Sequence, residues 1–101
     1  MRSGMNKVVL LSKVSVAITL LTSNRVLYES NVGWQRKLPI ECKEMYYKLY
    51  SEAYKYLLLL EKDIEQCTKQ IYRYGKLFDL AYDILDLHDD YCDFLIRTYD
   101  L

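Results

Sequence analysis

Apolar residues recur at alternating steps of three and four along the central part of the chain, which is the period of an amphipathic α-helix. The run starts after Pro39 and reaches Gly75 without another proline or glycine. Pro39 fits the first turn of a helix, and Glu41 and Glu44 place negative charge at its positive end. The pattern predicts one long helix over residues 39–74, ended by Gly75 in a left-handed conformation.

A second helix is predicted directly after it, over residues 77–99. The same step relates its apolar positions, which are Leu77, Leu80, Ile84, Leu87, Tyr91 and Phe94. Because the joint at Gly75 and Lys76 is short, the two helices are expected to fold back as an antiparallel hairpin.

The N-terminal third allows two interpretations. Read as strand, Val14, Val16 and Ile18 alternate with small polar or small apolar residues, and a strand pair turning near residues 23–24 would make the fold α+β. If the segment is a helix, it has a polar stripe opposite an apolar face, and the stripe consists of Ser12, Ser15, Thr19 and Thr22. We favour the helix, because the hairpin needs a third helix to cover its remaining apolar surface.

The predicted fold is therefore all-α, a small helical bundle in one domain of residues 1–101. Residues 1–5 are expected to form a disordered tail, and residues 30–38 a loop with Trp34 packed against the bundle. Only 3 glycines and 1 proline occur, which argues against an all-β fold with its frequent turns.

The apolar run at residues 8–21 resembles a membrane span or a signal-peptide core. Lys13 lies in its middle, however, and the run is shorter than the roughly 20 apolar residues that a membrane span needs. The three cysteines, Cys42, Cys67 and Cys92, match no metal-ligand spacing and are expected to be reduced. We therefore expect a cytoplasmic protein without membrane attachment.

Charge divides the chain, although its net charge is zero. Residues 1–40 carry a net charge of +5, and residues 77–101 carry −6. On a helical wheel the acidic stripe of the last helix falls within about 80°, opposite the apolar face. It consists of Asp79, Asp83, Asp86, Asp90 and Asp93. Such a stripe is either a solvated face or a recognition surface for a basic protein.

Aspartate at these positions has a cost. Like charges four residues apart on a helix repel each other by a few tenths of a kcal/mol, and glutamate would provide solubility with better helix propensity. A metal ion is not expected there, since carboxylates on the outside of one helix do not converge.

A second stripe, of Tyr47, Tyr50 and Tyr54, lies beside the apolar face of the long helix. It is either core between two neighbouring helices or an exposed aromatic strip, and tyrosine is enriched in interfaces. On the same helix Lys48, Lys55 and Lys62 recur every seven residues, which suggests a surface for nucleic acid.

Catalysis is not expected. The chain has one histidine, His88, which falls with the apolar face and is expected to be packed, and no nucleophile motif or glycine-rich phosphate loop occurs. No cofactor is indicated.

These observations favour a small non-catalytic interaction protein, an adaptor or inhibitor that uses the aspartate stripe, assisted by the three tyrosines, on a basic protein partner. The alternatives are a structural homo-oligomer, such as a homodimer, that uses the tyrosines, and a nucleic-acid binder. Residues with A/T-rich codons (Phe, Tyr, Met, Ile, Asn, Lys) number 34, against 12 for Gly, Ala, Arg and Pro. This bias suggests an AT-rich genome, such as that of a low-GC bacterium, its phages or another virus. A phage- or virus-encoded modulator of a host factor fits such a genome.

Overall fold

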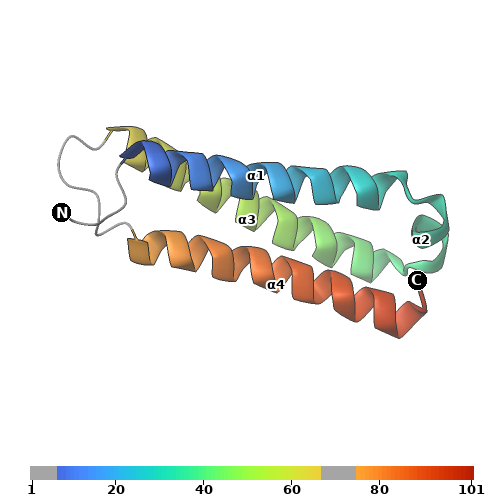
Figure 1. The fold of residues 1–101 in the computed structure, drawn as a ribbon. Coiled ribbons are helices and arrows are strands. Elements are labelled where there is room, and N and C mark those ends of the chain that lie inside the picture. The colour runs from blue at the N-terminus through green and yellow to red at the C-terminus, as the bar shows by residue number, and fades with distance from the viewer. Residues whose placement is uncertain (1–6, 67–74) are drawn as a thin grey trace.

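Three long helices lie side by side in the structure. The computed structural model describes residues 7–66 and 75–101, and these hold α1 (Lys7–Ser30), α2 (Val32–Lys37), α3 (Ile40–Gln66) and α4 (Gly75–Tyr99), with no strand. The molecule measures 51 × 20 × 18 Å, with α1 and α4 running in one direction and α3 in the other (Figure 1). The prediction of an all-α bundle is confirmed, and the alternative with an N-terminal β-hairpin is wrong.

The polar stripe of α1 explains how so many β-branched and hydroxyl residues fit a helix. The Thr19 hydroxyl donates to the Ser15 carbonyl oxygen at 3.0 Å, and the Thr22 hydroxyl donates to the Ile18 carbonyl oxygen at 3.0 Å. Each hydroxyl is thus satisfied within its own helix. The opposite face packs into the core through Leu10, Val14, Ala17, Leu21 and Tyr28.

The segment predicted as a loop contains a short helix, α2. The Asn31 side chain caps it, because Oδ1 accepts a hydrogen bond from the Trp34 backbone N–H at 3.1 Å. Leu38 is extended and ends the helix, and Trp34 is half-buried against the core as expected.

The predicted antiparallel hairpin is present as α3 and α4. The Pro39 carbonyl oxygen accepts from the N–H groups of Cys42 and Lys43, which starts α3 as the sequence indicated. Gly75 was expected to end the long helix in a left-handed conformation, and this is wrong: it is the first residue of α4, and no described glycine has a positive φ. The predicted helical part at residues 67–74 lies outside the described residues, as do the tail at 1–5 and Cys67.

The core lies along the contact of all three long helices. α3 contributes most to it, with Tyr46, Tyr50, Ala53, Leu57, Leu60 and Ile64. On α4 the buried side chains include Leu85, His88 and Leu95. The buried position predicted for His88 is confirmed, since 1% of its surface is exposed.

α1 is longer than the apolar run of residues 8–21 on which the argument against a membrane span rested. It extends to Ser30, well beyond the apolar run that ends at Leu21, and an 18-residue window has a mean hydropathy of 1.3. By length and composition alone such a helix is able to cross a membrane, and core helices and signal sequences share these properties. In the bundle, 22% of the window is buried.

Candidate functional site

The predicted aspartate stripe lies on the surface of α4. All five side chains are exposed: Asp79, Asp83, Asp86, Asp90 and Asp93. The structure gives none of them an ion pair with a residue that it describes, and the ion pair that it does show, Arg25–Glu29, lies on α1. Within the part of the chain that the structure describes, the stripe is therefore an uncompensated row of negative charge.

Asp89 belongs to the same surface, although the sequence analysis did not include it in the stripe. Its pKa is raised by partial desolvation and then by the carboxylates of Asp86, Asp93 and Asp90. Asp89 and Asp93 are on the side of α4 that meets α1, and they line a pocket there. The signal that could have identified it is the Asp89–Asp90 pair in the sequence, which widens the stripe toward α1.

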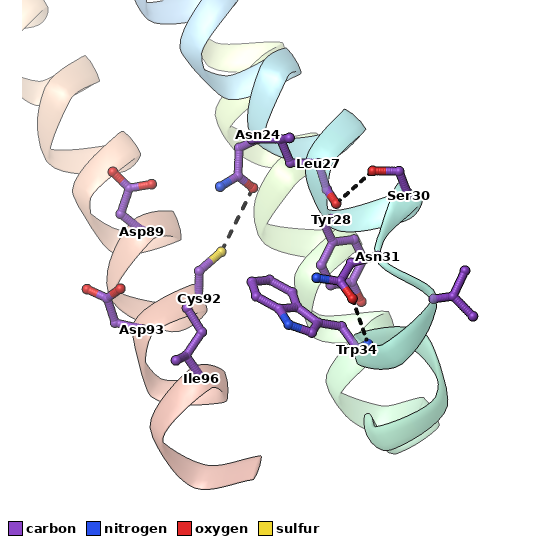
Figure 2. A pocket seen from close by; sticks show the side chains of 11 residues that line it. Asn24, Leu27, Tyr28, Ser30, Asn31, Trp34, Asp89, Cys92, Asp93 and Ile96 are labelled. Atoms are coloured by element: carbon purple, nitrogen blue, oxygen red, sulfur yellow. Dashed lines mark hydrogen bonds between the residues drawn. The ribbon is translucent and has the colours of Figure 1, made fainter. Parts of the chain in front are cut away.

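A pocket of about 690 Å³ lies between α1, α2 and α4. Figure 2 shows Asp89, Cys92 and Asp93 on the α4 side, with Asn24 across from them and the Trp34 indole reaching from α2 toward α4. Apolar side chains complete the wall, namely Leu27, Val32 and Ile96. The pocket thus combines an acidic edge with an apolar lining.

A smaller pocket of about 80 Å³ continues the space along the same two helices. Asn24 and Asp89 line both pockets, and the smaller one adds Leu20, Asp86 and His88. We call the two pockets together the α1/α4 groove.

One amide stands at the centre of the α1/α4 groove. Asn24 Oδ1 accepts a hydrogen bond from the Tyr46 hydroxyl at 2.5 Å, and the Cys92 thiol lies 3.9 Å from the same oxygen. Burial raises the pKa of Cys92 to about 11, so this thiol is protonated at neutral pH. Asn24 therefore joins α1 to both α3 and α4.

Two deeply buried polar atoms of the groove have no close hydrogen-bond partner among the described residues: His88 Nε2, and the Tyr28 hydroxyl, which has the Gln35 side chain near it. Tyr28 lines the larger pocket and is 3% exposed, and His88 lines the smaller one. Burial lowers the pKa of His88, so its imidazole is neutral. An unsatisfied buried polar atom costs free energy, so a polar group of a ligand that reached these atoms would lower that cost.

The tyrosine stripe does not form an exposed strip. Tyr50 is 6% exposed, and Tyr47 and Tyr54 are half-buried against the core. The Tyr47 hydroxyl donates to Glu29 Oε2 at 2.5 Å, and the Arg25 guanidinium lies 5.0 Å from the centre of the Tyr50 ring. Tyr47 and Tyr50 thus contact α1, and Tyr54 stacks on Tyr50. A part of Tyr47, Tyr50 and Tyr54 in partner binding stays a prediction.

The remaining candidates are dispersed. Lys48, Lys55 and Lys62 are exposed on α3. Cys42 and Cys92 are free thiols. Among the described residues, no group of three or more His, Cys, Asp or Glu side chains is placed to hold a metal ion.

Comparison with known proteins gives no relative of this chain. No protein-family model matches it, and no curated protein and no solved structure is significantly similar to it.

Proposed function

We propose that the chain is a small non-catalytic interaction module, an adaptor or inhibitor that binds a protein with a basic surface through the acidic face of α4. The observation that carries the proposal is a row of exposed carboxylates without described cationic partners, in a chain whose net charge is zero. The row consists of Asp79, Asp83, Asp86, Asp89, Asp90 and Asp93.

The arrangement of charge supports binding rather than simple solubility. Partial desolvation and then repulsion from the neighbouring carboxylates raise the pKa of Asp89, so the fold carries an electrostatic cost at this surface. A basic partner removes that cost on binding, and complementary charge also speeds encounter and fixes orientation.

The setting proposed for this activity is the cytoplasm, where the free thiols of Cys42 and Cys92 would stay reduced. The packing of α1 against α3 supports a role as a bundle helix over one as a membrane anchor. The excess of residues with A/T-rich codons agrees with a phage- or virus-encoded modulator, and also with a protein of a low-GC bacterium.

The two alternatives receive less support from the geometry. In a homo-oligomer built on the tyrosine stripe, Tyr50 would add little contact area to the interface between copies, because its side chain is already buried in the core. A nucleic-acid binder would need aromatic side chains beside Lys48, Lys55 and Lys62, and Tyr47 and Tyr54 instead pack toward the bundle.

Affinity capture from a lysate of the source organism, after nuclease treatment, tests the proposal. The wild type is compared with Asp83/Asp86/Asp90→Asn and with the control Glu44/Glu52/Glu65→Gln, which removes three exposed charges from α3. We expect a protein that is held by the wild type and the control and lost by the aspartate variant. Equal capture by all three chains would contradict the proposal.

A further inference from the structure

We infer that the α1/α4 groove binds a single amphipathic helix with basic flanks, which adds a fourth helix to the bundle. This inference rests on the proposed function and specifies the form of the partner. Its support comes from the geometry of the groove, its apolar lining, its charge and its unsatisfied polar atoms.

The geometry of the groove suits a helix. α1 and α4 run in the same direction and α3 in the other (Figure 1), and both pockets lie between α1 and α4, so a helix seated over the pockets can run antiparallel to both. The pockets extend along α4 from Tyr82 to Ile96. At 1.5 Å per residue this is about 21 Å, the length of roughly four helical turns.

The lining of the groove supplies the contact for an apolar face. Leu20 is 56% exposed and Leu27 is 70% exposed, one above the other on α1. Val32 and Ile96 are also exposed and line the larger pocket. An occupant with apolar residues at steps of three and four would cover this row.

Charge determines which helix fits. Asp86, Asp89 and Asp93 line the groove from α4, and none has an ion pair with a described residue. Lysine or arginine side chains at the edge of the occupant would meet these carboxylates. The same edge repels phosphate groups, so a nucleic acid or an anionic membrane is the less favoured occupant.

The unsatisfied polar atoms give an independent indication of a ligand. His88 is more than nine-tenths buried, its Nε2 lacks a partner among the described residues, and it lines the smaller pocket. Tyr28 of the larger pocket is buried to the same degree, and its hydroxyl has only the Gln35 side chain near it. Polar side chains of the occupant that enter the pockets would provide their hydrogen bonds.

The test uses the full chain and a 15-residue synthetic peptide of leucine and lysine, arranged with leucines on one helical face and lysines flanking them. A scrambled peptide of the same composition is the control. Trp34 lines the larger pocket, and the chain has no second tryptophan, so tryptophan fluorescence reports binding directly. Circular dichroism of each variant verifies its fold.

Three variants separate the groove from the rest of the acidic face. We expect Asp86/Asp89/Asp93→Asn to weaken binding of the helical peptide by about tenfold or more, and Asp79/Asp83/Asp90→Asn, which removes the same number of charges outside the groove, to weaken it clearly less. Leu20→Ser/Leu27→Ser changes only exposed side chains and should also weaken binding, while the scrambled peptide should bind poorly to every chain.

Equal binding of the two peptides would overturn the inference, since the groove would then recognise charge alone. An equal loss from the two aspartate variants would also overturn it and leave the proposed function intact. Absence of binding to the helical peptide would overturn it as well, and the lysate capture then decides separately whether the acidic face has a partner.

Discussion

The hydroxyl of Tyr46 donates a hydrogen bond to Asn24 Oδ1 at 2.5 Å, and this contact connects the centre of the core to the wall of the α1/α4 groove. The Tyr46 ring stacks on the Tyr28 ring, with 3.7 Å between their centres, and lies 4.8 Å from the imidazole of His88. Tyr46 thus contacts α1 and α4 from α3. Its three partners Asn24, Tyr28 and His88 all line the α1/α4 groove.

Removal of the Tyr46 hydroxyl should destabilise the fold modestly. We expect Tyr46→Phe to lower the free energy of unfolding by about 1 kcal/mol, because the Asn24 oxygen then keeps only the weak thiol donor of Cys92. Tyr46→Ala should cost about 3–5 kcal/mol by leaving a cavity. Urea denaturation followed by circular dichroism measures both, with Tyr54→Phe, a change at a half-buried position, as the control.

Stability should fall in mild acid because of His88. Burial lowers the pKa of the folded imidazole below its ordinary 6.5. As the pH falls below this value, the unfolded chain takes up a proton that the folded chain does not, so the free energy of unfolding decreases. Above about pH 7 the imidazole is neutral in both states and contributes no pH dependence.

The measurement compares the wild type with His88→Leu by urea denaturation between pH 7 and pH 5. The wild type should lose stability more steeply than the variant in that window. Asp89 follows His88 in the chain, and the pKa of its carboxyl group is raised in the folded state. Its protonation at lower pH therefore raises the free energy of unfolding, opposite to the effect of His88. Asp89→Asn in both chains removes this contribution. Parallel pH profiles for the two chains would disprove a neutral buried imidazole.

Neutralising Asp89 should stabilise the isolated chain. Asp89→Asn removes the repulsion with Asp86, Asp90 and Asp93, which is worth a few tenths of a kcal/mol for each close pair on a helix surface. The melting temperature should therefore rise slightly at low ionic strength, and the gain should shrink in high salt. Asp79→Asn at the far end of the stripe should give a smaller gain, and an equal one would indicate a general charge effect.

Cys92 should react slowly with alkylating reagents. Its pKa of about 11 leaves little thiolate at pH 8, and its side chain is half-buried between α1 and α4. Digestion and mass spectrometry after iodoacetamide treatment should show modification of Cys92 only at high pH or in denaturant. Rapid labelling of the folded chain at pH 8 would show that the groove opens.

The helical period was sufficient to predict α3 and α4, whose apolar side chains recur at steps of three and four. For α1 the pattern left a strand pair open, and the need to cover the hairpin decided for a helix. The period was also sufficient to place His88 inside, since its position on the wheel coincides with the apolar face. The helix at residues 32–37 was missed, although Asn31 is a typical N-cap residue. The role of Gly75 was wrong, because a glycine beside a helix boundary fits either the end of one helix or the start of the next.

The candidate site was only half predictable. A wheel places the aspartates opposite the core, but it does not show which flank of α4 faces α1, so Asp89 and the groove were missed. In the same way, a wheel does not show that Arg25 and Glu29 of α1 cover Tyr47 and Tyr50. These relationships depend on how the helices are arranged in space, which the spacing of residues within one helix does not determine.

The most direct test of the account is the map of amide chemical-shift changes in ¹⁵N-labelled protein when the leucine–lysine helical peptide is added. We predict that the changes cluster at residues 20–34 and 82–96, with the Trp34 indole N–H among the most affected. Changes centred on Lys48, Lys55 and Lys62, or spread evenly over the surface, would contradict a binding groove between α1 and α4.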